Sequence, residues 1–466
     1  MAAAAHASGE TGTKADRLPA NLVVPVALGT LLQALNSSMI AVALVSIQHD
    51  FRAGTEASWL ISGLYLATAV GAPTMGRLAD LIGPRKVFLA GLAVIAVTSA
   101  AAPFAPNIGV LIVLRVLLGI GTSAPYPAGL AMIRAEADRR GLPSASGGLG
   151  VLAVAGQVAV ALGPPLGGAL VQLFGWQAVW LVNLPFVAVA AIMALRHLPG
   201  GGHRPDRALA RQLDGAGVLL FAATMTALML LLLSATNRPL WALVPVVVVL
   251  GGLLVFRETR TRRPFLDVRL LASNRALTLT YVRTMVTYVA FYMIFYGLPE
   301  WLQRGRGLDS GQAGLVMLPM AAIGATTAIV AARWERRAGS RPLLVTGSVV
   351  FVLAGLALAF TGSNASVLTL IGLMALLGLP NGFNSLGNQT SVYRAAPANR
   401  MGAASGLYRT SQYVGANLAA VVLALVFTGS AAGSATDAGL HRMAFTVAAI
   451  GAVLAVAALS SRHLRK

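Results

Sequence analysis

The chain has 466 residues, of which 57% are hydrophobic and only 11% are charged, and its mean hydropathy is +0.75. This composition excludes a soluble globular domain, and with it the nucleic-acid partner that a net charge of +20 would otherwise suggest. The absence of cysteine excludes disulfides, thiolate metal sites and cysteine catalysis.

Residues 1–20 are small and polar and lack the apolar core of a signal peptide, so we expect a disordered cytoplasmic tail. Fourteen apolar runs follow, each long enough to cross a hydrocarbon core of ~30 Å as a helix. They fall at roughly 22–47, 57–76, 86–105, 108–132, 147–171, 177–195, 215–235, 239–256, 276–299, 311–332, 342–361, 365–388, 402–428 and 441–460. Because backbone polar groups in lipid must be paired within a segment, we predict an all-α integral membrane protein with fourteen transmembrane helices.

Basic residues gather in every second gap between these runs. Counting both ends of the chain, these gaps hold 27 of the 35 Lys and Arg residues, and the opposite gaps hold five. Since basic residues are enriched on the cytoplasmic side, both termini are predicted to be cytoplasmic. The remaining three, Arg115, Arg283 and Arg409, lie inside apolar runs.

An internal repeat divides the chain. The gap 76–86 aligns with the gap 332–342, which pairs Gly83 with Gly339 and makes the second and tenth runs equivalent. The repeat predicts two six-helix bundles with two extra central helices. The expected parts are a cytoplasmic tail (1–20), an N-terminal bundle (21–196), a linker with the extra helices (197–275), a C-terminal bundle (276–461) and a short cytoplasmic tail (462–466).

Three groups of residues resemble signatures of the major facilitator superfamily, and specifically of its fourteen-spanner branch of drug:proton antiporters. The gap after the second run carries Gly76, Asp80, Gly83, Arg85 and Lys86. The fourth run carries Arg115, Gly119 and Gly121. The fifth run carries the antiporter signature Gly156, Gly163, Pro164, Gly167 and Gly168. The resemblance covers the whole chain and implies a secondary-active transporter.

In the gap 77–86, glycines allow close approach of two helices, and Asp80 is suited to an arginine or a helix N-terminus. The resemblance implies a cytoplasmic latch that breaks and reforms during alternating access. Orientation by positive charge alone would explain the basic residues of this gap but not the aspartate. In the fifth run, the double proline and nearby glycines favour a bend that seals the outward side, against the alternative of ordinary membrane packing.

The three arginines inside apolar runs need partners, because a charge near a helix centre costs roughly 2.5–3.5 kcal/mol on insertion scales. We expect them to face a central cavity, where aromatic neighbours such as Tyr288 and Tyr408 would suit planar substrates. Arg115 could instead bond neighbouring carbonyls, and Arg283 could reach the membrane interface.

Asn36 occupies the place where the resemblance implies an aspartate. A buried carboxylate can exchange protons near neutral pH, whereas an amide cannot. The remaining candidates for proton coupling are Asp80 at the cytoplasmic mouth and Glu300 at the outer end of the ninth run. Glu300 could equally be a solvated loop residue.

The predicted function is export of drug-like or secondary-metabolite compounds, driven by protons, as in multidrug and antibiotic resistance. A net positive cavity favours neutral or anionic cargo, so a transporter of organic anions, by potential-driven export or symport, is the alternative. No cluster suited to catalysis, a metal or a cofactor is present at membrane depth, so we expect neither an enzyme nor a cofactor. The expected partners are a small organic substrate, protons and membrane lipids, for a monomer in a bacterial cell membrane.

Overall fold

The computed structural model describes residues 18–53, 57, 59–142, 145–198, 214–234, 240–261, 264–308, 310–427 and 437–461. These residues form helices and short connections, and they contain no strand. The first helices are α2 (Ala20–Phe51), α3 (Trp59–Ile82), α4 (Pro84–Ala101), α5 (Ile108–Thr122), α6 (Pro125–Arg139), α7 (Ser146–Phe174), α8 (Ala178–Leu181) and α9 (Asn183–His197). The central helices are α11 (Gly215–Ser234), α12 (Leu243–Arg260) and α13 (Val268–Ser273). The last are α14 (Arg275–Glu300), α15 (Ser310–Ala338), α16 (Ser340–Ala359), α17 (Val367–Ala395), α18 (Met401–Phe427) and α19 (Asp437–Ser460).

Each predicted apolar run coincides with one of these helices or with a consecutive pair. Within the described residues, ten helical segments are long and apolar enough to cross a membrane. The all-helical membrane fold is therefore confirmed, while the count of fourteen crossings stays a prediction. The expected tails lie largely outside the described residues, which begin at 18 and end at 461.

Two of the predicted helices are divided. The fourth run is split between α5 and α6 at Pro125, which occupies the first turn of α6, where a missing N–H costs little. The sixth run begins with the short α8 before α9. The connection to the C-terminal half adds the short α13, which begins where Asp267 accepts a hydrogen bond from the Leu270 N–H at 2.9 Å.

The internal repeat is visible in the backbone. Gly83 precedes α4 with φ 99°, and its partner in the repeat, Gly339, precedes α16 with φ 77°. Both turns need a left-handed conformation that only glycine adopts without strain. The equivalence of the two gaps, inferred from aligned residues, thus corresponds to the same local geometry.

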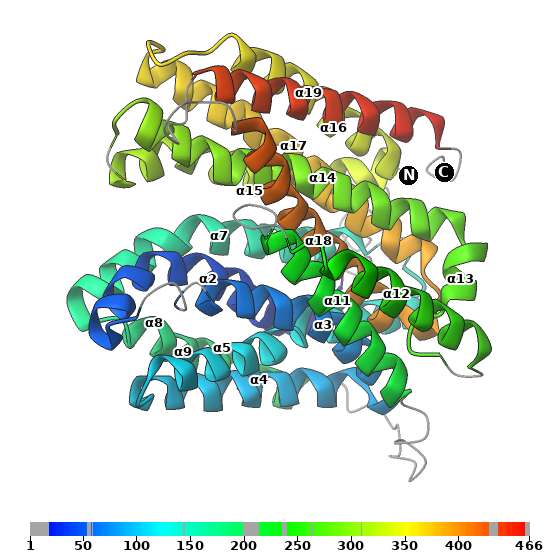
Figure 1. The fold of residues 1–466 in the computed structure, drawn as a ribbon. Helices are drawn as coiled ribbons and strands as arrows, with labels where there is room; N and C mark the ends of the chain where they lie inside the picture. Colours follow the sequence, from blue (N-terminus) through cyan, green and yellow to red (C-terminus); the bar gives the residue numbers. More distant parts are fainter. Residues whose placement is uncertain are drawn as a thin grey trace, which may run out of the picture.

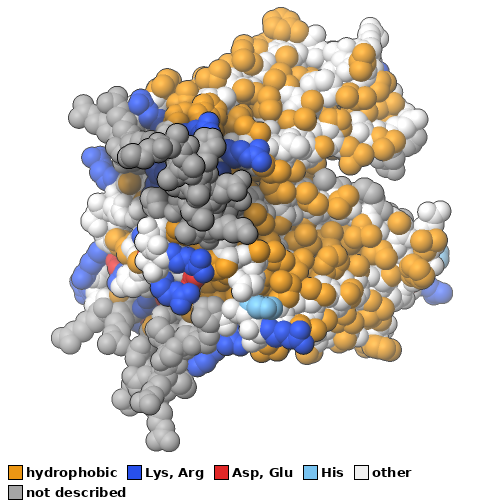
Figure 2. Space-filling view, turned by 180° about the vertical axis from the view of Figure 1, so that it is seen from behind, with side chains coloured by type: hydrophobic (Ala, Val, Ile, Leu, Met, Phe, Trp, Pro, Cys, Tyr) orange, Lys and Arg blue, Asp and Glu red, His pale blue; other side chains and the backbone are white. Residues whose placement is uncertain are grey.

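The helices form two stacked bundles (Figure 1). Helices α2 to α9 pack together in one half, and α14 to α19 in the other. The two halves meet mainly where α3 packs on α18 and where α7 packs on α15. The extra helices α11 and α12 pair with each other, and α11 contacts α3 and α18 beside that junction. The surface matches a membrane protein, because Figure 2 shows a broad hydrophobic face with most of its Lys and Arg side chains at one end.

Small residues let the backbones of α3 and α18 touch. A Cβ on Gly406 would lie 2.5 Å from the Cα of Pro73, and Gly76 faces Gly402 just as closely. Ala69 adds a hydrogen bond across this junction, since its carbonyl accepts from the Thr410 hydroxyl at 2.8 Å. Contacts of this kind drive helix association in membranes, where apolar surface alone gives no advantage.

We expect Gly406→Val to destabilise the folded protein. The added side chain must push α18 away from α3, and overpacking of this kind costs about 1–3 kcal/mol. Thermal unfolding of the purified protein in detergent should show a midpoint several degrees lower. Gly372→Val is the control, because a Cβ at Gly372 meets nothing within 4 Å. Equal midpoints for the two variants would contradict the close approach.

Candidate functional site

A cavity lies between the two halves, and water-sized molecules could occupy about 100 Å³ of it. Aromatic hydroxyl groups dominate its wall. Its described lining contains six tyrosines, namely Tyr65, Tyr126, Tyr288, Tyr292, Tyr408 and Tyr413. They come from α3, α6, α14 and α18, so both halves build the cavity. Tyr126 and Tyr408 stack across the junction, with ring centroids 6.3 Å apart.

Arg409 is the one charged side chain among the described residues that line the cavity. Its guanidinium lies 3.9 Å from the centre of the Tyr126 ring, and its Nη1 donates to Gln412 Oε1 at 3.2 Å. Its Nε has no hydrogen-bond partner within the described part of the chain. Arg409 thus lies in the cavity wall beside aromatic rings, and its role there stays a prediction.

Polar side chains of α17 complete the wall. Gln389 donates from Nε2 to the Tyr126 hydroxyl at 2.8 Å, while its Oε1 is buried without a partner in the described structure. Asn381 and Ser385 line the same cavity. These three residues were missed in the sequence, although their spacing of four places them on one face of a helix and could have revealed them. Two polar atoms beside the cavity, Arg409 Nε and Gln389 Oε1, are therefore buried without a partner in the described structure.

Arg115 is not among the residues that line the cavity. Its side chain is 1% exposed, and it donates from Nε to the Leu60 carbonyl at 2.9 Å and from Nη2 to the Asn36 carbonyl at 2.8 Å. The ring of Trp180 lies 5.4 Å away. Arg115 thus ties α5 to α3 and α2, which corresponds to the structural alternative rather than to the expected cavity position.

Arg283 also lies outside the described cavity lining. It is 6% exposed and donates from Nε to Asn388 Oδ1 at 2.7 Å, which joins α14 to α17. Arg283 therefore occupies neither of the two positions expected from the sequence, the cavity wall and the membrane interface. Of the three arginines, the structure brings only Arg409 to the cavity, so the wall carries one positive charge rather than three.

Asn36 forms a closed pair with Asn183. Its Nδ2 donates to Asn183 Oδ1 at 2.7 Å, and Asn183 Nδ2 donates back to Asn36 Oδ1 at 3.0 Å. Asn183 also donates to the Ser99 hydroxyl at 3.0 Å. Both side chains are almost fully buried. The amide that replaces the expected acid is therefore a structural link between α2 and α9.

Asp80 bridges the two halves at the end where the basic gaps lie. It accepts hydrogen bonds from the Gly402 N–H at 2.9 Å and the Ala403 N–H at 3.0 Å. These are free donors of the first turn of α18, where the helix dipole also favours a negative charge. Arg85 acts within one half instead, since its Nη2 donates to the Leu195 carbonyl at 2.7 Å. Lys86 is exposed.

Asp80 lies outside the apolar run 57–76, in the polar gap that follows it. Its pKa can therefore be compared with that of an aspartate in water. Burial raises the pKa of Asp80 to about 6. The hydrogen bonds from Ala403 and Gly402 and the charges of Arg77 and Arg400 act in the opposite direction. The contact with α18 therefore holds a carboxylate that titrates just below neutral pH.

The glycines of the fifth run lie in two places, the cavity wall and the contact between α7 and α2. Gly156 lines the cavity. Gly163 faces Ser38, and a Cβ on Gly167 would lie 3.1 Å from the Cα of Met39, so both let α7 approach α2 closely. Gly168 is half-buried in the same turn. Helix α7 runs unbroken through Pro164, whose side chain lies outside the described residues.

The side chain of Glu300 also lies outside the described residues. Its backbone ends α14, and a π-helical turn, Trp301–Gly305, continues the segment. Trp301 is fully buried and donates from Nε1 to Asp437 Oδ1 at 3.0 Å, which fixes this turn to α19. A coupling role for Glu300 stays a prediction.

The comparisons with known proteins agree with this architecture. The family model described as Major Facilitator Superfamily matches residues 26–420. An uncharacterized MFS-type transporter of Bacillus subtilis, YwoD, is 37% identical over 86% of this chain and 89% of its own. The tetracenomycin C resistance and export protein of Streptomyces glaucescens is 29% identical over 87% of this chain and 75% of its own. A crystal structure of the human organic anion transporter MFSD10 superimposes with a TM-score of 0.66 at 18% identity, covering 94% of this chain and 99% of that one, which shows a shared fold.

We expect acidification to strengthen the contact between Asp80 and α18. The pKa of Asp80 is about 6 in the contact and near 3.9 in a free aspartate, so the joined state binds a proton more tightly. Linkage then favours the joined state as the pH falls from about 7 to about 5, and this contribution is lost as the pH rises through about 6. Distances between spin labels on α3 and α18 should shorten over this range. Asp80→Asn should make this distance independent of pH. A distance that lengthens on acidification in the unmodified chain would refute the prediction.

We expect Arg115→Met to lower stability. The variant removes two hydrogen bonds from a charged group to the Leu60 and Asn36 carbonyls, and bonds of this kind contribute about 1.5–3 kcal/mol each. Thermal unfolding in detergent should show a clear decrease. Arg409→Met is the comparison, since Arg409 makes one side-chain hydrogen bond, of 3.2 Å, and should tolerate the change better. A larger loss for Arg409→Met would overturn the assignment.

Proposed function

Because the chain belongs to the major facilitator superfamily and is a multi-span membrane transporter, we propose that it exports small organic compounds by alternating access, driven by protons. The tetracenomycin C resistance and export protein supports the direction, since its name describes export. The proposed moving parts are the bundles 21–196 and 276–461, with 197–275 as their linker. The proposed setting is a bacterial cell membrane, with both termini cytoplasmic and the chain acting as a monomer. The 27 basic residues in alternate gaps support this orientation.

The composition of the cavity wall carries the proposal. Six tyrosine rings and the Arg409 guanidinium surround a space between two halves. Aromatic rings bind planar organic surfaces, and an arginine adds a directed donor. The Nε of Arg409 and the Oε1 of Gln389 are buried without a partner in the described structure, and each would gain a hydrogen bond if its side chain turned toward a substrate. We infer that planar aromatic compounds bearing an acceptor group, neutral or anionic, are the preferred cargo.

The Asp80 contact fits a gate that closes the basic end. It joins α3 to the first turn of α18 and lies two turns from Arg409 along that helix. Arg134 adds a second contact between the halves, because it donates to the Tyr393 carbonyl at 2.7 Å. In the proposed cycle these contacts break when the cavity opens to the cytoplasm and reform when it opens outward.

Transport of organic anions without proton exchange is the second candidate. It is favoured by a cavity that carries one arginine and, within its described lining, no carboxylate. Moving one negative charge outward through 100 mV yields ~2.3 kcal/mol. At ~1.4 kcal/mol per decade, that sustains an outward gradient of roughly fifty-fold for a monoanion. Symport of an anion would instead give inward accumulation.

The test is accumulation of a fluorescent planar anion and a fluorescent organic cation in an efflux-deficient bacterial host that expresses the chain. Exclusion of the anion that collapses with a protonophore supports proton-driven export. If the pH gradient is removed while the membrane potential is maintained, continued exclusion of the anion supports the second candidate. Exclusion of the cation alone would refute the inferred cargo.

We expect Arg409→Gln to reduce anion export by at least tenfold, because the variant removes the charge that binds the cargo. Loss of a charge-assisted hydrogen bond of 1.5–3 kcal/mol corresponds to roughly 10–150-fold in affinity. Initial rates in proteoliposomes measure the change. Arg275→Gln is the matched control, since Arg275 is exposed at the start of α14. Equal rates for both variants would exclude Arg409 from substrate binding.

A further inference from the structure

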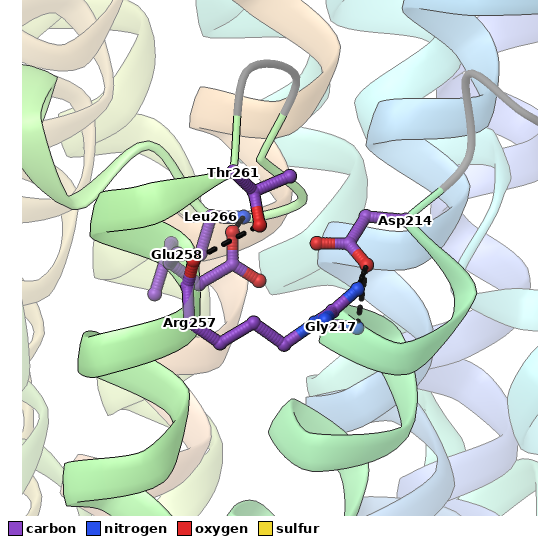
Figure 3. Close-up of polar contacts among 6 residues, drawn as sticks. All are labelled: Asp214, Gly217, Arg257, Glu258, Thr261 and Leu266. Carbon is purple, nitrogen blue, oxygen red and sulfur yellow. Dashed lines mark hydrogen bonds and ion pairs between the residues drawn. The ribbon is translucent and has the colours of Figure 1, made fainter.

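Two acidic side chains meet at the basic end of the extra helices. Asp214 immediately precedes α11, and Glu258 lies in the last turn of α12. Figure 3 shows their carboxylates pointing toward each other between the two helices. The Asp214 side chain is 3% exposed and Glu258 is 1% exposed. Neither residue lines the cavity or contacts Asp80.

Each carboxylate uses one oxygen and leaves the other without a partner. Asp214 Oδ1 accepts from the Gly217 N–H at 2.9 Å and from Arg257 Nη2 at 2.5 Å. Glu258 Oε2 accepts from the Leu266 N–H at 3.1 Å. Asp214 Oδ2 and Glu258 Oε1 are buried and have no hydrogen-bond partner among the described residues. Both free oxygens lie within 3.0 Å of the point that a Cβ on Gly217 would occupy, so they converge on one place.

This arrangement is unfavourable when both groups are ionised. Two carboxylates that face each other in a buried site repel, and each free oxygen has lost its water. Arg257 is paired with Asp214, and it balances only one of the two negative charges. Among the described residues, Asp214 and Arg257 are the charged groups that act on Glu258. A single proton on Glu258 Oε1 would remove the excess charge and donate to Asp214 Oδ2.

We propose that Asp214 and Glu258 form a binding site for one proton at the cytoplasmic end of the two extra helices. The inference rests on the proposed proton-driven transport, and it supplies a proton site that the Asn36–Asn183 pair does not provide. The step is a simple protonation, in which one proton from water binds Oε1 and no other bond forms or breaks.

The site is matched to neutral pH. Burial is the main cause that raises the pKa of Glu258 to about 7, and the charge of Asp214 adds to it. The hydrogen bonds from the Leu266 and Phe265 N–H groups and the charge of Arg257 act in the opposite direction. Glu258 lies beyond the apolar run 239–256, at the end of the molecule where the basic residues lie.

A short path of contacts joins this site to the junction of the two halves. Glu258 accepts a hydrogen bond from the Leu266 N–H, and the next residue, Asp267, forms an ion pair with Arg400. Arg400 lies two residues before Gly402, whose N–H donates to Asp80. Deprotonation of Glu258 alters the charge beside the loop that holds Arg400. The proton site is thereby coupled to the α3–α18 contact.

The test is infrared difference spectroscopy of the purified full chain in lipid, titrated across neutral pH. We expect a protonated-carboxyl band that titrates at about pH 7 and is absent in Glu258→Gln. Asp214→Asn should move the titration to lower pH, because it removes the like charge while asparagine still caps α11. Asp80→Asn is the control and should keep the band. These spectra need no substrate, so failed export would not affect the result.

A band at about pH 7 that persists in Glu258→Gln, or no such band in the unmodified chain, would overturn the proposal. A carboxylate shift caused by sodium or potassium at constant pH would assign the pair to a metal cation instead. Hydrogen exchange of the peptide containing Gly402 tests the coupling. The exchange rate of this peptide in Glu258→Gln should equal that of the unmodified chain at about pH 6 and differ from it at about pH 8. Equal rates at both pH values would show that the site is not coupled to the junction.

Discussion

The structure depends on one constraint, which is that every charge taken out of water needs a partner within the protein. An unpaired charge or polar group in a low-dielectric interior costs several kcal/mol, and lipid cannot offset it. Arg115 meets the constraint through two backbone carbonyls, and Arg283 meets it through Asn388. Arg409 meets it only in part, through a tyrosine ring and one amide. That difference distinguishes the two arginines that hold helices together from the one that lines the cavity with an unpartnered donor among the described residues.

The same constraint also acts at the junction between the two halves. At its Asp80 end, the α3–α18 junction combines small residues, backbone groups and the Asp80 carboxylate with buried apolar side chains such as Met401. Backbone N–H groups at the start of α18 are free donors whether or not Asp80 is present, so water can replace the carboxylate when the halves part. The polar part of this junction can therefore exchange its hydrogen bonds with water.

The sequence predicted the helices well because hydropathy and loop charge are properties of short segments. The equivalence of Gly83 and Gly339 was also predictable, since only glycine takes their φ values easily. The positions of Arg115 and Arg283 were not predictable, because the side on which a buried charge lies depends on tertiary partners. Asn183 shows this most clearly. Its role depends on Asn36, which lies 147 residues away.

The Asn36–Asn183 pair has a consequence for coupling. An acid that lined the cavity would bind a proton and a cationic substrate in the same place, so the two would compete, but the described lining holds no acid and Asn36 lies outside it. The described titratable groups lie instead at the basic end, where Asp80 contacts the start of α18 and Glu258 is linked to it through the segment Leu266–Asp267 and Arg400. A proton bound there would act on the contact between the halves rather than on the substrate. Under this arrangement the charge of the cargo and the number of protons moved can vary independently, which suits a cavity whose one charge is positive.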